Sequence, residues 1–142
     1  MIWVFIASFL FSGPSGTWNT NFEEAKQEAS ENNKYILLSF SGSDWCIPCM
    51  RMETDIFESD VFREFAEKNL VMVKADFPRQ KRNALSPSQA KQNDKLAEKY
   101  NPDGIFPYTI IMTPQGKNLV AFEGLYKGNA YTFVQKMEAI IH

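Results

Sequence analysis

The segment SGSDWCIPC, residues Ser41 to Cys49, contains both cysteines of the chain, with two residues between them. It directly follows a compact apolar run, Tyr35 to Phe40, and contains Gly42; the run and the glycine together predict a buried strand that ends at a turn. The residues that continue from the motif, CMRMETDIF, place apolar side chains among charges at helical spacing. The motif is therefore predicted to lie where a strand passes into a helix.

Two cysteines at this spacing suit reversible disulfide chemistry. With Cys46 at the start of a helix and Cys49 one turn later, the side chains share a face and can reach the α-carbon separation of about 5.5 Å that a disulfide prefers. Unpaired N–H groups and the helix dipole stabilise an anion at Cys46, which predicts a thiol pKa below that of free cysteine. Cys46 is then the attacking thiolate, and Cys49, expected to be the more buried thiol, resolves the mixed disulfide.

The rest of the chain predicts an alternation of helices and strands. Besides the helix after the motif, capping patterns and apolar spacing predict helices at about residues 21–33, 59–69, 86–100 and 129–141. Apolar runs predict strands at residues 35–40 and 70–77 and a hairpin of residues 108–112 and 119–124. The polar stretch 78–87 is predicted to be a surface loop.

Particular residues mark the starts and the buried faces of these helices. The predicted helix starts are Asn21, Ser59 or Asp60, and Ser86. Apolar spacing assigns Met50 or Met52 after the motif, and Phe133, Met137, Ile140 and Ile141 in the last helix, to the core.

This order of elements predicts an α/β protein. Strands joined through helices become parallel neighbours by right-handed crossovers, whereas the final hairpin adds antiparallel strands. The expected result is a central mixed β-sheet flanked by helices on both faces. A chain of 142 residues with 44% apolar content is sufficient for one such domain.

Composition argues against several kinds of ligand. The formal net charge of −2 and the charged fraction of 23% give no reason to expect a nucleic-acid partner. A short basic run, Arg79, Lys81 and Arg82, is interpreted as a solvated loop without a function. Structural zinc needs about four Cys or His ligands, but beyond the cysteine pair the chain offers only His142. Neither a metal nor a cofactor is therefore expected.

Residues 1–16 are expected to be a targeting segment, and the domain is assigned to residues 17–142. The apolar stretch Met1 to Phe11 is shorter than the roughly 20 residues that a membrane-spanning helix needs, and small residues follow it from Ser12 to Gly16. This pattern resembles a secretory signal peptide and predicts export, as to a periplasm. A short N-terminal anchor and a first strand of the core are the alternatives, because no Lys or Arg precedes the apolar stretch.

The motif and its position resemble thioredoxin, and most closely the bacterial thioredoxin-like proteins in which SFSGSDWC-x-x-C follows a strand. The similarity covers about residues 20–141 and implies a thioredoxin fold. It also implies that Cys46 is the nucleophile, that Cys49 resolves the mixed disulfide and that Trp45 covers the active site. Pro48 matches the proline before the second cysteine of thioredoxin, whereas Ile47 replaces its glycine.

A later proline, in GIFPYTIIM, matches the second hallmark of the family. The resemblance implies that Pro107 forms a cis peptide bond and lies against the disulfide, although cis X–Pro bonds are otherwise uncommon. It also implies that the backbone of Phe106 pairs with an extended substrate segment and that the missing N–H of Pro107 helps keep metals from the sulfurs. Phe106, Pro107 and Ile47 are thus the predicted substrate-binding residues, and Phe106 is larger than the family's usual residue.

The sequence departs from the family at the groups that assist proton transfer. Thioredoxin has a buried Asp on the strand before its motif and a Lys on the next strand. This chain has Ser39 or Phe40 at the first position and Met72 at the second, so the proton relay is expected to be absent. Asp44 is the nearest replacement, with turn capping as its alternative role.

Three functions remain open from the sequence. The first is a thiol–disulfide oxidoreductase that reduces protein disulfides through Cys46 and Cys49, with a potential nearer about −270 mV than about −120 mV. The second is a binding or assembly module that holds a partner protein or Cu(I) without turnover. The third is a thioredoxin-fold domain with an inert, structural cysteine pair. The first function predicts a monomer whose partners are protein disulfides and an upstream reductant, for which a membrane protein is a candidate.

Overall fold

The structure, a computed structural model, describes residues 17–142, so the expected targeting segment 1–16 lies outside the described residues. One sheet contains the strands β1 (Tyr35–Ser41), β2 (Leu70–Asp76), β3 (Tyr108–Met112) and β4 (Asn118–Glu123), in the order β2-β1-β3-β4. Strands β1 and β2 are parallel, whereas β3 is antiparallel to both β1 and β4. The predicted mixed sheet is therefore confirmed.

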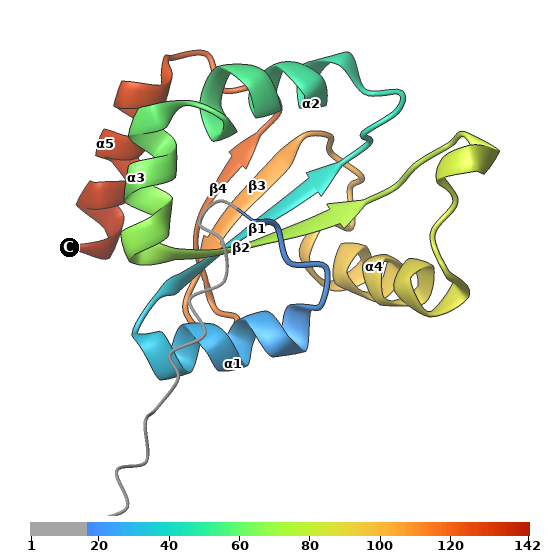
Figure 1. Cartoon of the computed structure of the whole chain (residues 1–142), viewed down its shortest axis with the longest axis horizontal. Helices are drawn as coiled ribbons and strands as arrows, with labels where there is room; N and C mark the ends of the chain where they lie inside the picture. Colours follow the sequence, from blue (N-terminus) through green and yellow to red (C-terminus); the bar gives the residue numbers. More distant parts are fainter. Residues whose placement is uncertain (1–16) are drawn as a thin grey trace, which may run out of the picture.

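Helices cover both faces of this sheet (Figure 1). One face packs against α1 (Phe22–Asn32) and α4 (Pro87–Tyr100), and the other against α2 (Ile47–Met52), α3 (Asp60–Asn69) and α5 (Ala130–Ile141). A π-helical turn, η1 (Glu53–Phe57), continues α2, and a 3₁₀ turn, η2 (Lys81–Asn83), lies in the loop after β2. None of the helices within residues 17–142 is long and apolar enough to span a membrane.

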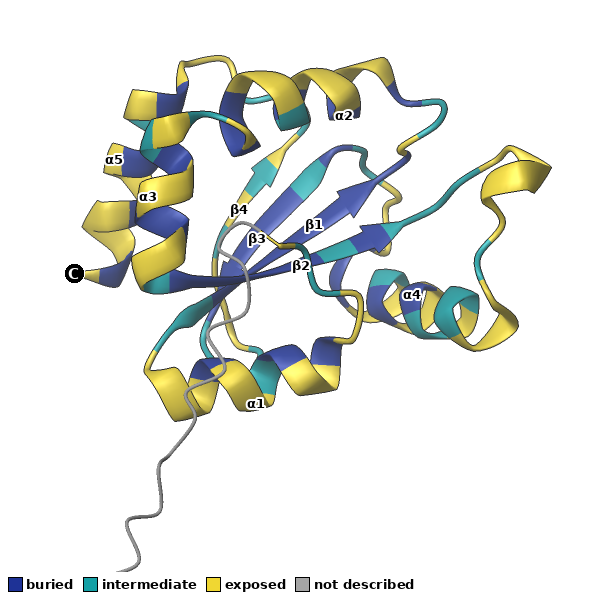
Figure 2. Ribbon diagram, viewed as in Figure 1, coloured by how far each residue is buried: buried dark blue, intermediate teal, exposed yellow. Residues whose placement is uncertain are grey.

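Strand β1 is central and is buried on both faces, as Figure 2 shows. Because side chains alternate along a strand, Leu37 enters the core beneath α3 and α5, whereas Ile36 and Leu38 enter the core against α1 and α4. A nearly continuous apolar run, here interrupted only by Ser39, is the expected sequence of such a two-sided strand. The strand therefore anchors the motif that follows it to both cores.

The helices begin where the capping residues predict. Asn21 accepts a hydrogen bond from the N–H of Glu24, Ser59 from that of Phe62, and Ser86 from that of Gln89. Each of these bonds satisfies a backbone N–H that the helix itself leaves unpaired. Each bond stabilises the folded protein by about 1 kcal/mol. Of the two residues proposed to open α3, Ser59 is the N-cap and Asp60 is the first helical residue.

Two apolar residues predicted for the core lie on the surface instead. Met50 is 38% exposed, whereas Met52 is buried, because one residue of a helix advances the side chain by about 100° and turns Met50 away from the face of Cys49. Ile140 is 37% exposed. The buried stripe of α5 passes from Met137 to Ile141, four residues later, and leaves Ile140 at its edge.

An aromatic cluster joins α5 to the elements around it. The ring of Phe133, which is fully buried, lies 4.9 Å from that of Phe122 and 5.1 Å from that of Tyr126. It also meets Phe57 and Phe62, so the cluster connects β4 and α5 with η1 and α3. The end of the helix that carries the cysteine motif is thereby packed against the core.

Replacement of Phe133 by alanine is expected to destabilise the protein by about 3–5 kcal/mol, because it removes a fully buried ring and leaves a cavity. Urea denaturation of the oxidised protein measures this change. The control Tyr131→Ala, on the exposed side of α5, is expected to change the free energy of unfolding by less than about 0.5 kcal/mol. Equal effects of the two substitutions would contradict the assigned core.

Candidate active site

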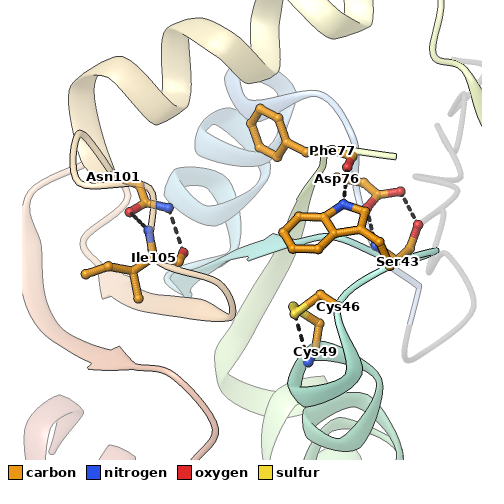
Figure 3. The surroundings of a disulfide bond; sticks show 8 residues. Ser43, Cys46, Cys49, Asp76, Phe77, Asn101 and Ile105 are labelled. Atoms are coloured by element: carbon orange, nitrogen blue, oxygen red, sulfur yellow. Dashed lines mark hydrogen bonds between the residues drawn. A yellow bond between two sulfur atoms is a disulfide. The ribbon is translucent and has the colours of Figure 1, made fainter. Parts of the chain in front are cut away.

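The loop between β1 and α2 is fixed by the end of the neighbouring strand. The carbonyl of Gly42 accepts hydrogen bonds from the N–H groups of Trp45 and Cys46, at 3.2 and 2.8 Å, which closes a tight turn. Ser43 donates from both its N–H and its hydroxyl to the carboxylate of Asp76, the last residue of β2 (Figure 3). Because β1 and β2 are parallel, their carboxyl ends meet at one edge of the sheet, and this edge holds the motif.

Glycine is required at position 42 by the indole that lies over it. A Cβ atom added there would lie 2.2 Å from Cε2 of Trp45, closer than any nonbonded contact allows. The glycine that marks the end of the predicted strand therefore also makes room for Trp45. This second role depends on a tertiary contact and is not visible in the sequence.

Cys46 and Cys49 form a disulfide across the first turn of α2, with their α-carbons 5.2 Å apart. Cys46 is the N-cap of the helix, and its sulfur accepts a hydrogen bond of 3.2 Å from the N–H of Cys49. Pro48 occupies the first turn, where the missing N–H costs no helical hydrogen bond. The predicted position of the motif at a strand-to-helix junction is confirmed.

The two cysteines do not differ in burial as predicted. Cys46 is 4% exposed and Cys49 is 5% exposed, so the expectation that Cys49 is the more buried residue was wrong for the oxidised state. The disulfide draws both side chains onto one helix face. Ile47, which points away from that face, is 64% exposed. The order of attack must therefore rest on the N-cap position of Cys46 rather than on exposure.

The second predicted element of the site, Pro107, immediately precedes β3. The Phe106–Pro107 peptide bond is cis, and Pro107 is buried. Its carbonyl accepts a hydrogen bond of 2.8 Å from the N–H of Gly124, after the end of β4. This loop is thus attached to the outer hairpin of the sheet.

Asn101, which the sequence analysis did not single out, also shapes this loop. The buried side chain donates to the carbonyl of Ile105 and accepts from the N–H of Ile105, both at 2.9 Å (Figure 3). These paired bonds fix the backbone one residue before Phe106. Nothing in the sequence around Asn101 showed that its side chain would be buried.

Trp45 connects the motif to the loops beside it. Its Nε1 donates a hydrogen bond of 2.7 Å to the carbonyl of Phe77, and its ring meets the edge of Phe106 with ring centres 5.5 Å apart. The guanidinium of Arg79 lies over the same ring, 3.6 Å from its centre. The predicted active-site residues Trp45 and Phe106 are therefore brought together, with Arg79 as an addition that the sequence did not reveal.

Asp44 anchors the loop after β2. Its carboxylate accepts hydrogen bonds from the backbone N–H groups of Arg79 and Gln80, at 2.9 and 3.0 Å, and from the side chain of Asn83 at 3.0 Å. The bond from the Arg79 backbone, followed by that from Asn83, holds the pKa of Asp44 below its ordinary value of 3.8. These contacts support the capping role considered for Asp44 rather than proton transfer.

The strand register corrects the assignment of Met72 to the position of the family's lysine. In the sheet register Ser39 pairs with Lys74 on β2, whereas Met72 pairs with Leu37, so the basic residue lies two positions later than predicted. The Nζ of Lys74 lies 3.2 Å from Oε2 of Glu53, and the N–H of Glu53 bonds to the carbonyl of Cys49. A carboxylate–ammonium pair therefore lies one helical turn beyond the second cysteine.

The sheet contains one further buried polar group, at a position next to Ser39. Thr109 on β3 is opposite Ser39 in the register, and both residues are buried. Within the described part of the chain, the Thr109 hydroxyl has no hydrogen-bond partner. Residues 17–142 contain no group of three or more His, Cys, Asp or Glu side chains arranged to hold a metal ion.

Comparisons with known proteins agree with this geometry. A family model described as thioredoxin-like matches residues 17–114. The disulfide bond reductase DsbH of Chlamydia pneumoniae is 32% identical over 121 residues, which are 85% of this chain and 70% of that protein. A solved structure of a DsbH oxidoreductase superposes with a TM-score of 0.79 at 32% identity, covering 88% of this chain and 83% of the other.

A more distant solved structure shares the fold alone. A thioredoxin from Thermus thermophilus superposes with a TM-score of 0.62 at 15% identity, over 82% of this chain and 81% of its own. Together with the Cys46–Cys49 disulfide, the nearer similarities define the class of protein as a thiol–disulfide oxidoreductase. The chain belongs to the thioredoxin-like family.

Replacement of Asp44 by asparagine is expected to loosen the loop after β2. The amide cannot accept all three hydrogen bonds, so the N–H groups of Arg79 and Gln80 should exchange with solvent about tenfold faster at neutral pH. Hydrogen exchange followed by NMR measures this rate. The control Asp103→Asn, in an exposed turn, should leave both amides unchanged.

The same experiment has a defined pH dependence. Folding lowers the pKa of Asp44. The carboxylate therefore stabilises the loop fully above the ordinary pKa of 3.8, and this stabilisation is lost as pH falls through the lower pKa of the folded state. Protection of the two amides in the unmodified protein should therefore persist at pH 5 (about one unit above that value) and weaken only in stronger acid. Loss of protection already at pH 5 would contradict the anchoring role.

Proposed function

We propose that this protein reduces disulfides of other proteins. In the reduced state the Cys46 thiolate attacks one sulfur of a substrate disulfide, forming a mixed disulfide and releasing the other substrate sulfur as a thiolate. The Cys49 thiolate then attacks the Cys46 sulfur and releases the second substrate sulfur. Two electrons pass to the substrate, which takes up two protons, and the protein is left with the Cys46–Cys49 disulfide.

The observation that carries this proposal is the disulfide across the first turn of α2, with Cys46 as its N-cap. In the reduced state the N–H of Cys49 can donate to the Cys46 thiolate as it donates to its sulfur in the disulfide, which stabilises the charged nucleophile. The similarity to a disulfide bond reductase favours reduction over oxidation as the direction of transfer.

An extended segment of the substrate is proposed to bind beside Pro107. Among residues 17–142, the backbone N–H and C=O of Phe106 form no hydrogen bond, so both are available to pair with a polypeptide. The exposed side chain of Ile47, the residue after Cys46, adds apolar surface. This arrangement suits β-augmentation, in which main-chain hydrogen bonds bind the substrate and side-chain pockets select it.

The Glu53–Lys74 pair is proposed to receive the proton of Cys49. When Cys49 attacks the mixed disulfide, its thiol must lose a proton, and Glu53 lies one helical turn away along the same helix. Lys74 and Trp18 both donate to the Glu53 carboxylate at 3.2 Å and hold it in place. This pair takes the role that a strand Asp has in thioredoxin and that Asp44 was considered for.

The proposed function also suggests where the protein acts and which partner it needs. We propose that residues 1–16 direct the domain of residues 17–142 out of the cytoplasm, where disulfides persist and need a dedicated reductant. The disulfide formed in each cycle must be reduced by an upstream redox partner. A membrane protein that carries electrons across the membrane is one candidate for this role, and the domain is proposed to act as a monomer.

Substitution of each cysteine by serine tests the mechanism. Cys46→Ser is expected to abolish reduction of a protein disulfide such as insulin, since the nucleophile is lost. Cys49→Ser is expected to accumulate a stable mixed disulfide through Cys46, detected by mass spectrometry. Mixed disulfides formed through Cys49 in the Cys46→Ser variant would reverse the assigned order of attack.

Two further outcomes separate the proposal from its alternatives. Equilibration with glutathione should give a potential near the thioredoxin value of about −270 mV, and a value near about −120 mV would overturn the reductive direction. A reduced protein that binds stoichiometric Cu(I) tightly and reduces no disulfide would favour the binding module instead.

A further inference from the structure

The basic run after β2, interpreted from sequence as a solvated loop, contains one residue with a defined position. The guanidinium of Arg79 stacks on the ring of Trp45, 3.6 Å from its centre. Trp45 is the residue immediately before the nucleophile Cys46. Lys81 and Arg82 in the same loop are exposed and make no such contact with a ring. A single positive charge of this loop therefore lies on Trp45, the neighbour of the nucleophile in the chain.

Hydrogen bonds fix the backbone of Arg79 and the indole of Trp45. Asp44 accepts from the N–H of Arg79 and from two groups further along the loop, which fixes the backbone that carries the guanidinium. The indole is fixed in turn by its bond to the carbonyl of Phe77. The loop that carries Arg79 is thus tied to Asp44 in the motif loop, and the ring on which Arg79 stacks is tied to the residue that follows β2.

Arg79 forms one wall of a groove that also includes Trp45, the residue before Cys46. The groove has a volume of about 630 Å³ and is lined by Trp45, Phe77, Pro78, Arg79, Gly104 and Phe106. Phe106 meets both Trp45 and Phe77 with ring centres 5.5 Å apart, so aromatic rings form the other walls. Arg79 is the one charged residue of this lining, and the free backbone of Phe106 lies at its side.

The charge of Arg79 is not neutralised by the protein. Within residues 17–142 no carboxylate forms an ion pair with Arg79. The Asp44 carboxylate, although close in space, accepts from backbone N–H groups and from Asn83. Stacking covers one face of the guanidinium but leaves the N–H donors at its edge free for an incoming carboxylate, which an arginine can bind through two parallel hydrogen bonds.

We propose that Arg79 selects substrate polypeptides that carry an acidic side chain next to the reactive cysteine. A substrate strand paired with Phe106 would place a neighbouring side chain in the groove, where a carboxylate would meet the free edge of the guanidinium. An apolar side chain would contact only the aromatic rings of the groove. A lysine or arginine would be repelled by the positive charge of Arg79. This inference rests on the proposed function and specifies the substrates of the same site.

Three peptide disulfides that differ in one property test the proposal. Each has the same sequence except that the residues on both sides of the cysteine are Glu, Gln or Lys. The unmodified protein in its reduced form is expected to reduce the Glu peptide about fivefold faster, as kcat/KM at low ionic strength, than the Lys peptide, with the Gln peptide between them.

Substitutions in the loop separate Arg79 from general electrostatics. Arg79→Gln should bring the three peptides to similar rates, and Arg79→Glu should reverse the order, so that the Lys peptide becomes the fastest. A reversal is a gain for one substrate, which a damaged site cannot produce. The matched control Arg82→Gln removes the same charge from the same loop and should keep the original preference.

The contrary outcomes are distinct. Equal rates for the three peptides with the unmodified protein, or equal loss of preference in Arg79→Gln and Arg82→Gln, would overturn the role of Arg79 while leaving the reductase intact. Failure of the reduced protein to react with any of the three peptides would contradict both the role of Arg79 and the proposed function.

Discussion

The site depends on the position of one sulfur atom at the start of a helix. Cys46 is the N-cap of α2, and the N–H of Cys49 donates to its sulfur. This placement requires that the preceding loop leave β1 at a fixed angle, which the turn closed by Gly42 and the bonds from Ser43 to Asp76 provide. The parallel pairing of β1 and β2 brings Asp76 to that edge of the sheet. The position of the Cys46 sulfur therefore depends on the pairing of these two strands.

Much of the fold could be predicted because its signals are local. The run YILLSF contains the apolar residues of a two-sided strand, and the polar residues Asn21, Ser59 and Ser86 mark helix starts by the bonds that they form. The cysteine spacing likewise fixes which residues can form a disulfide on one helix face. Such patterns require no knowledge of how distant segments meet.

The parts that sequence reasoning missed depend on distant segments. Lys74 was overlooked because a strand register decides which residue lies beside Ser39, and a shift of two residues separates lysine from methionine. Asn101 and Arg79 became visible only when the loops that carry them were placed against the motif. The equal burial of the two cysteines likewise reflects tertiary neighbours rather than the helix position from which the difference was predicted.

The most direct test of the central claim is the ionisation of Cys46 in the reduced protein, measured by thiolate absorbance in a Cys49→Ala variant. That variant keeps the backbone N–H that donates to the Cys46 sulfur, so its effect on the remaining thiol is retained. The N-cap position predicts a Cys46 pKa below the value of about 8.5 for free cysteine. A Cys46 pKa at or above that value would contradict the account.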